Sequence, residues 1–528
     1  MRPAHEVAEA ALAALGGEGV VVVHEHHGVD IRFAANTVTT NGVRHQRRVT
    51  VVAVRDRSDG RCVGVASGSG AVVAPGTRTG AGAGAGVGSG GGRRAVGVVP
   101  TAGVVAGSGH GSGVSPSAGG TGRLGPSSSP VAAGTGASQQ GWFSWRQLVE
   151  AAEADAAGSE PADDAFDLVQ GPAAADFAEP AGRSAPAVLA GIATGLGDSF
   201  DQALADGLVV SGFAEHAEDT VYVASTTGLR LRHAQPTGKV QVVLRTTDGT
   251  ASSWVGVGTE DVAGVSLDGL LGEARRRLSW AARRVELPPG RYPTVLPPDA
   301  VADLVCMLGE AAVGREAEEG RGVFSAPGGG TRVGEQLLAM PMELRADPFE
   351  PGLPCTPFVV TTASGSDTSV FDNGLALERT AYLREGRLAQ LRYHRAGAAR
   401  AGVAPAPRVD NLVLELPGAT ETVDDLVRSV DRGLLVTCLW YIREVDPATL
   451  LLTGLTRDGV YLVERGEVVG AVNNFRFNES PLGVLQRASA VGATERALSR
   501  EWNEWFPRTA MPPVLVPDFN MSSVSPAI

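Results

Sequence analysis

A long stretch of the chain, residues 67–140, contains no aspartate, no glutamate and no aromatic residue. Its centre, residues 80–92, reads GAGAGAGVGSGGG. Such a sequence cannot bury enough apolar surface to offset the conformational entropy that is lost when it becomes ordered. We therefore expect a disordered, solvent-exposed insertion, with the folded protein built from the residues on either side. A GxGxxG match inside it (Gly86, Gly88, Gly91) lacks the flanking strand and helix of a dinucleotide site, so we attribute it to low complexity.

The sequence around this insertion predicts an α+β protein. Helices are expected where apolar residues recur at helical spacing, and strands where β-branched residues cluster. The expected helices cover residues 5–15, 145–156 and 187–205, a segment capped by Ser266, and a segment that begins near Pro298. The expected strands cover residues 20–23, 29–33, 49–54, 62–66, 220–224, 230–232, 240–245 and 253–257. From about residue 358 we expect mostly antiparallel sheet, with tight turns at Asp372-Asn373-Gly374, Arg384-Glu385-Gly386, Arg457-Asp458-Gly459 and Glu464-Arg465-Gly466.

These patterns divide the 528 residues into four regions, one of which is the insertion. The chain is long enough for about three domains of ~150 residues each. Residues 1–66 are the first part of an N-terminal α+β domain, and residues 67–140 are the Gly/Ser/Ala-rich insertion. Residues 141–290 complete the N-terminal domain and add central helices. Residues 291–528 are expected to form a β-rich C-terminal domain.

Charge and cysteine usage narrow the class of protein. The formal net charge is −13, which argues against a surface that follows nucleic-acid phosphates. No apolar run approaches the ~20 residues of a membrane-spanning helix, and the N-terminus shows no signal peptide. The cysteines are scattered and form no CxxC pair, which suits the reducing cytoplasm: Cys62, Cys306, Cys355 and Cys438.

One window has the spacing of a metal-binding helix without its ligands. Residues 309–316 read GEAAVGRE, so Gly309 and Gly314 occupy the two histidine positions of an HExxxH motif, and Glu310 occupies the glutamate position. A register shifted by one residue places Glu310 and Arg315 there instead. Neither register supplies a pair of zinc ligands, and an arginine would repel the metal.

Three other segments carry a family resemblance. They are the tail from Gly433 to Leu485, the segment LPPDAVADL from Leu296 to Leu304, and the segment TGLRLRHAQPTGKVQVVL from Thr227 to Leu244. Together they closely resemble the TldD/PmbA family, known as modulators of DNA gyrase. The resemblance covers most of residues 185–522 and, more weakly, the first sixty-odd residues, but not the insertion.

The resemblance implies one of two kinds of subunit. TldD-type chains are zinc peptidases that use HExxxH and a cysteine near the C-terminus, whereas TldE (PmbA)-type chains share the fold and lack these ligands. This sequence contains no HExxxH, and its last cysteine, Cys438, lies in an expected strand with none in the tail after it. The resemblance therefore implies a TldE-type subunit without catalytic or metal-binding residues of its own. It would pair with a TldD-type zinc subunit in a complex that processes small or unfolded peptides, and a homodimer stays open.

Several other residues have a chemical and a structural interpretation. In HEHH (residues 24–27), His24 and His26 share a strand face, but no third metal ligand is evident, so we favour surface or inter-subunit histidines over a metal site. Cys306 and Cys438 lie in apolar runs and are expected to be buried. An acidic group is expected on a solvated helix face: Glu310, Glu316, Glu318 and Glu319. An arginine group is expected to be solvated, with a subunit contact as the alternative: Arg275, Arg276, Arg283 and Arg284. The tryptophans Trp440, Trp502 and Trp505 are expected to pack in the core, and for Trp502 and Trp505 a subunit interface is the alternative.

Two alternatives to the non-catalytic subunit stay open. The chain is then either a peptidase in its own right with an unrecognised site, or a peptide-binding scaffold without a protease partner. Without a metal to lower the pKa of a bound water, Glu310 alone contributes little to hydrolysis. A fold shared with peptidases does not by itself establish the activity.

Overall fold

The structure is a computed structural model, which describes residues 2–71, 144–504 and 508–526. Most of the expected insertion at 67–140 therefore lies outside the described residues. Its first residues, 67–71, belong to a strand that pairs with residues 46–50. The strand thus continues past residue 66, because its backbone finds a partner even where the sequence has become rich in glycine and serine.

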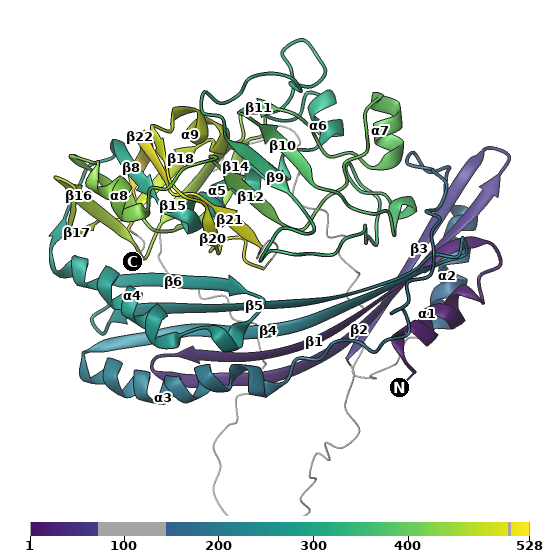
Figure 1. The fold of residues 1–528 in the computed structure, drawn as a ribbon, viewed down its shortest axis with the longest axis horizontal. Coiled ribbons are helices and arrows are strands. Elements are labelled where there is room, and N and C mark those ends of the chain that lie inside the picture. The colour runs from purple at the N-terminus through teal and green to yellow at the C-terminus, as the bar shows by residue number, and fades with distance from the viewer. Residues whose placement is uncertain (1, 72–143, 505–507, 527–528) are drawn as a thin grey trace, which may run out of the picture. The chain divides into compact units, whose positions relative to one another are not determined.

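The N-terminal region is built on one antiparallel sheet with the order β3-β2-β1-β4-β5-β6 (Figure 1). Its strands are β1 (Glu18–Ala34), β2 (Thr37–Arg57), β3 (Gly60–Ala71), β4 (Leu208–Ser225), β5 (Arg230–Thr246) and β6 (Ser252–Thr259). The sequence predicted two short strands where β1 runs without a break. The polar residues 24–28 lack the expected apolar pattern, but they pair with β2 on one side and β4 on the other.

Helices cover one face of this sheet at its two ends. Helices α1 (Ala4–Leu12) and α2 (Trp145–Gly158) pack on β1, β2 and β3, and Val21 and Val23 belong to their apolar cluster. Helices α3 (Ala190–Ala205) and α4 (Leu267–Ser279) pack on β4, β5 and β6 (Figure 1). Ser266 caps α4 as predicted, because its Oγ accepts a hydrogen bond from the Gly269 backbone N–H.

The C-terminal region contains two further sheets, which confirms the prediction of a β-rich, mostly antiparallel domain. The six-stranded sheet has the order β11-β10-β9-β12-β21-β20, and the ten-stranded sheet has the order β14-β15-β18-β22-β8-β13-β16-β17-β7, with β19 paired to β22. Parallel pairs occur at β12–β21, β13–β8 and β17–β7. The strands of the smaller sheet are β9 (Glu343–Ala346), β10 (Thr380–Arg384), β11 (Arg387–Leu388), β12 (Leu412–Glu415), β20 (Glu495–Ala497) and β21 (Thr509–Met511). Those of the larger sheet are β7 (Arg284–Val285), β8 (Gly290–Leu296), β13 (Arg432–Val436), β14 (Leu439–Asp446), β15 (Leu451–Thr456), β16 (Val460–Glu464), β17 (Glu467–Val472), β18 (Phe475–Glu479), β19 (Ala490–Val491) and β22 (Val514–Val524).

Two of the four predicted turns join paired strands. Glu385 and Arg465 adopt positive φ angles of 51° and 55° in the β10–β11 and β16–β17 hairpins. The turn at 457–459, where Asp458 has a φ of 55°, also lies between two strands, β15 and β16, but these strands pair with other strands and not with each other. The turn at 372–374 follows a short 3-10 helix, Val370–Asp372, and joins no strands. Local turn chemistry does not report which strand pairs with which.

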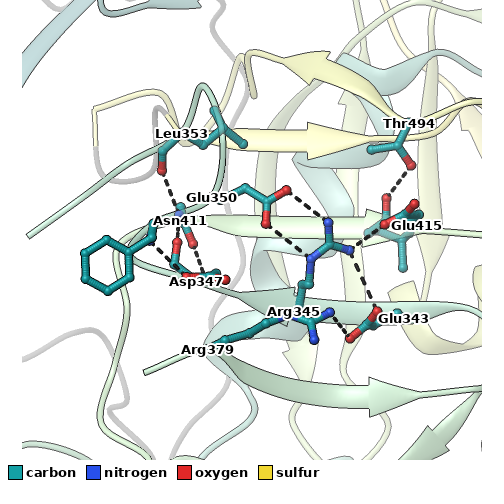
Figure 2. Close-up of polar contacts among 11 residues, drawn as sticks. Glu343, Arg345, Asp347, Glu350, Leu353, Arg379, Asn411, Glu415 and Thr494 are labelled. Carbon is teal, nitrogen blue, oxygen red and sulfur yellow. Dashed lines mark hydrogen bonds and ion pairs between the residues drawn. The ribbon is translucent and has the colours of Figure 1, made fainter. Parts of the chain in front are cut away.

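An ion-pair network holds the short strands of the six-stranded sheet together. Glu343 and Glu415 face each other across β9 and β12, an arrangement of like charges that destabilises a sheet. The Arg345 guanidinium offsets this repulsion, because it lies 2.6 Å from Glu415 and 3.9 Å from Glu343 while also bonding Glu350 (Figure 2). Arg379, the residue before strand β10, donates a hydrogen bond to Glu343 (Figure 2).

Helix α5 (Pro298–Glu310) lies in the core between these two sheets. It contacts β20 and β21 of the smaller sheet and β8 and β14 of the larger one. Pro298 stands in its first turn, as predicted. The other C-terminal helices are short: α6 (Gly314–Glu318), α7 (Arg395–Ala401), α8 (Val423–Arg428) and α9 (Pro481–Arg487).

Candidate functional site

The window with the spacing of a metal motif is divided between two helices. Helix α5 ends at Glu310, and α6 begins at Gly314, so the expectation that residues 309–316 lie within one helix is wrong. Between the helices, Val313 forms a parallel bridge with Arg392, and the Gly314 N–H donates to the Arg392 carbonyl. This backbone pairing draws residues 311–313 out of the helical path.

The Arg392 side chain closes the C-terminal end of α5. Its guanidinium donates to the carbonyls of Gly309 (2.6 Å) and Glu310 (2.7 Å) and to the Asp367 carboxylate (2.8 Å). The last carbonyls of a helix have no partner within it, and a cation at this end also favours the helix dipole. Burial alone would lower the pKa of Arg392, but the charges of Asp367 and Glu310 outweigh burial and raise that pKa above its ordinary value.

A second arginine binds the glutamate of the window. The Arg408 Nη1 lies 2.7 Å from Glu310 Oε2, and Arg392 lies 4.0 Å from the same oxygen. Burial lowers the pKa of Arg408, and the Glu310 carboxylate more than compensates, so the pKa of Arg408 is raised. The Glu310 carboxylate is therefore neutralised by two guanidinium groups.

The two glycines of the window have no room for larger side chains. A Cβ on Gly314 would lie 1.9 Å from the Tyr393 ring, and a Cβ on Gly309 would lie 2.9 Å from the Leu412 side chain. The Tyr393 hydroxyl in turn donates to Glu318 at 2.8 Å. Tyr393 thus fills the space that the second side chain of an HExxxH motif would need.

A zinc ion does not fit this window. The positions of the two histidines are glycines, the one carboxylate is bound by arginines, and permanent cations repel a metal. Cys306, on the same helix α5, is buried, and burial raises the pKa of its thiol well above the ordinary value. No step of metal chemistry can therefore be assigned to residues 309–316.

The acidic residues after the window line a pocket of about 430 Å³. Arg315 is exposed and pairs with Glu319 at 3.0 Å, while Glu316 accepts a hydrogen bond from Ser366. Glu318 is held by Tyr393. The lining residues are Asp163, Arg315, Glu318, Glu319, Ser366, Tyr393, His394, Gly397 and Arg400.

The two cysteines expected in the core are buried, as predicted. Cys438 lies between β13 and β14 and not inside a strand, which corrects its predicted placement. Burial raises the pKa of its thiol to about 12, although Arg500 donates to its Sγ at 3.1 Å. A thiol with such a pKa is a poor nucleophile and a poor metal ligand at neutral pH.

The other candidates occupy polar surroundings within the chain. His24 and His26 share a face of β1, and His26 bonds Asp219 at 2.7 Å. The Trp502 indole donates to the carbonyl of Asp303 on α5, Trp440 packs on Arg500, and Trp505 lies outside the described residues. The arginines of the α4 region all have intramolecular partners: Arg275 with Asp206, Arg276 with Glu273, Arg283 with Glu464, and Arg284 with the Thr250 carbonyl.

Three residues of the site were not found from the sequence: Arg392, Tyr393 and Arg408. They are distant from the window in the chain and belong to no motif. The weak signal is an arginine inside the run LRYH, where Leu391 and Tyr393 are buried. A buried arginine needs an anionic or carbonyl partner, but the sequence does not identify that partner.

Comparison with known proteins identifies a family for the C-terminal region. The sequence profile described as the PmbA/TldA metallopeptidase C-terminal domain matches residues 289–523. Among curated protein sequences, none matches the chain. In the part of the chain that the structure describes, no helix has the length and apolar composition needed to span a membrane.

Solved structures share the fold over nearly the whole chain. TldE from Thermococcus kodakarensis has a TM-score of 0.67 at 14% identity and covers 98% of both chains. A protein described as a candidate modulator of DNA gyrase from Thermotoga maritima has a TM-score of 0.65 at 14% identity, covering 98% of this chain and 99% of its own. Another from Bacteroides thetaiotaomicron has a TM-score of 0.62 at 12% identity, covering 98% of both. The profile match shows that residues 289–523 are a C-terminal domain of the TldD/PmbA family, and the solved structures show the same fold over nearly the whole chain.

Proposed function

We propose that the chain is a non-catalytic TldE/PmbA-like subunit of a metalloprotease complex. Its partner is a TldD-type subunit that carries HExxxH and the zinc, and the complex processes small or unfolded peptides. The observation that carries the proposal concerns residues 309–316, which have the spacing of an HExxxH motif. Arg392 and Arg408 bind Glu310, and Tyr393 fills the space beside Gly314. These contacts supply no metal ligand and leave Glu310 without a metal-bound water to deprotonate.

In this proposal the chain shapes access to the partner's active site. The pocket beside α6 offers both carboxylates and guanidinium groups, which suits the polar backbone and termini of peptides. The scattered cysteines, which form no disulfide, support a cytoplasmic location.

A cleavage assay tests the proposal. The chain is assayed on unfolded peptides alone and mixed with the TldD-type chain of the same organism, each with and without a chelator. We expect cleavage only in the mixture and its loss with chelator. Chelator-sensitive cleavage by this chain alone would overturn the proposal.

A matched pair of substitutions sharpens the assay. Glu310→Gln in this chain should leave cleavage by the mixture unchanged, because Glu310 is bound to arginine and has no metal to act with. Replacement of the glutamate in the partner's HExxxH by glutamine should abolish it. A large loss of the cleavage rate with Glu310→Gln, in a mixture that still assembles, would contradict a non-catalytic role for this chain.

A further inference from the structure

The HEHH segment presents different residues on the two faces of β1. His24 and His26 lie on one face, and Glu25 and His27 lie on the other, since side chains alternate along a strand. On this second face, His27 stands directly opposite His45 of β2, and Glu25 stands opposite Arg47. The structure therefore supplies the third side chain that the sequence around residues 24–27 lacks.

Both imidazoles direct the same ring nitrogen at one carboxylate oxygen. His45 Nε2 lies 2.8 Å from Glu25 Oε2, and His27 Nε2 lies 4.0 Å from the same atom. The two rings are stacked, with centroids 3.7 Å apart and planes tilted by 30°. The three donor atoms all lie within 4.8 Å of one another.

The site is shielded from solvent, and its side chains are of types that bind metal ions. The side chain of Glu25 is 3% exposed and that of His27 is 13% exposed. Neutral imidazole nitrogen and ionised carboxylate are ligands of zinc.

We propose that Glu25, His27 and His45 bind a divalent transition-metal ion, with zinc as the preferred ion and water in the fourth position. With metal–ligand bonds of ~2.0–2.2 Å, tetrahedral geometry places ligand atoms roughly 3.3 Å apart. The observed separations of 2.8 and 4.0 Å lie on either side of that value. Because the two rings are stacked, both must turn for their Nε2 atoms to converge on one ion.

Nearby charged groups modulate the affinity. Arg47 binds Glu25 through Oε1, which orients the carboxylate and leaves Oε2 directed at the imidazoles. Its positive charge, and that of Arg183 near His27, opposes a divalent cation and weakens binding. Glu218 of β4 stands opposite His27 on the same face and is a further carboxylate beside the site.

The position of the site indicates a structural effect. It lies between the apolar cluster under α1 and α2, which includes Val23, and the cluster under α3 and α4, which includes Val29. A metal bound there would cross-link β1 to β2 between the two apolar clusters. Binding to the folded state alone also stabilises it by mass action.

Metal titration of the full-length chain tests the proposal. Chain stripped with chelator is titrated with zinc by calorimetry and with cobalt by visible absorption, which reports tetrahedral coordination. Each of His27→Gln and His45→Gln should lower zinc affinity by roughly 100-fold or more, since even outer-shell changes cost about 10–100-fold. The matched controls are His24→Gln and His26→Gln, on the opposite face of the same strand, which should bind zinc as the parent does.

Three outcomes would overturn the proposal: no saturable binding, an equal loss in the His24 and His26 controls, or retained affinity in both ligand variants. Circular dichroism of the metal-free variants verifies that they fold, and Glu25→Gln, which keeps the shape of the carboxylate, provides a second route if one histidine variant does not. The proposed function is tested independently of this metal site, by the cleavage assay. Cleavage by the mixture should stay chelator-sensitive with His27→Gln, because that activity depends on the partner's zinc.

Discussion

Gly314 is a glycine because Tyr393 occupies the space that a side chain would need. The same residue pair explains why the window cannot be restored to a metal site by substitution of the glycines alone. A histidine at this position would have to displace a ring that is held by Glu318. Packing at this position therefore opposes metal binding independently of charge.

The first prediction concerns this packing. Gly314→Ala should lower the free energy of unfolding by about 1–3 kcal/mol, because the added methyl overlaps the Tyr393 ring. Gly309→Ala is the control and should cost less, since its methyl meets the end of the flexible Leu412 side chain. Urea unfolding measures the free energy of unfolding of both variants. Equal losses in the two variants would contradict the conclusion that Tyr393 leaves no space for a side chain at Gly314.

The second prediction concerns the buried guanidinium. Arg392→Met should destabilise the protein by about 3–5 kcal/mol, because it leaves Asp367 and the last carbonyls of α5 without their partner. Arg315→Met, on an exposed arginine five residues beyond Glu310, should cost only about 0–1 kcal/mol. A small effect of Arg392→Met on the urea midpoint would show that water replaces the guanidinium.

Among the elements, α5 organises the C-terminal domain through two buried carboxylates as well as through apolar contacts. Asp299 accepts the Leu498 N–H, and Asp303 accepts hydrogen bonds from Leu439, Ser499 and Glu501. The helix thus holds both the start of β14 and the segment at 498–501. Residues on all sides of α5 are buried, so the core surrounds the helix.

The third prediction follows from this burial. Burial raises the pKa of Asp303 to about 7, although its three hydrogen bonds oppose the rise. Between pH ~4 and pH ~7 the folded chain then retains a proton that the unfolded chain has released. Stability contributed by this group is therefore lost as pH rises through that window.

Asp303→Asn should reduce the fall in unfolding free energy between pH 4 and pH 7, measured by urea unfolding at several pH values. Asp268→Asn, on the exposed first turn of α4, serves as the control and should retain the parental pH dependence. An unchanged slope in Asp303→Asn would show that the carboxylate stays ionised across the window.

In the whole molecule, Arg500 is one of the residues that link the N-terminal sheet to the C-terminal domain. Arg500 lies over the rings of Trp254 from β6 and Trp440 from β14, at 5.6 and 4.8 Å. Arg500 also donates hydrogen bonds to the Cys438 thiol and the Asp458 carboxylate. The backbone carbonyl of Asp458 accepts a hydrogen bond from the backbone N–H of Trp254. Regions distant in the chain therefore share one buried polar cluster.

The fourth prediction concerns this link. Arg500→Met should destabilise the protein by about 3–5 kcal/mol, since it leaves the buried Asp458 carboxylate without its partner. Arg443→Met is the matched control, because Arg443 is exposed and its pair with Glu501 contributes about 0–1 kcal/mol. Tryptophan fluorescence during urea unfolding measures the stability of each variant. Equal unfolding midpoints for the two variants would contradict the conclusion that Arg500 stabilises the contact between the N-terminal sheet and the C-terminal domain.

The degree to which the sequence predicted the molecule differs between elements. Helices α2, α3 and α4 and the cap at Ser266 were found from periodicity and capping chemistry, which are local properties. The full length of β1 and the break between α5 and α6 were missed. Both depend on backbone pairing with distant segments, β2 and β4 for the strand and Arg392 for the break.

By itself, the sequence determined the α+β class and the absence of an HExxxH motif, because composition, periodicity and motif spacing are properties of the linear chain. Its resemblance to the TldD/PmbA family was also visible in the sequence, in segments such as residues 433–485. The tertiary structure alone decided what occupies the degenerate window and which side chains join the histidines of β1. Arg392, Tyr393, Arg408 and His45 act through contacts with residues far from them in the sequence, and such contacts exist only once the sheets have paired and the core has closed.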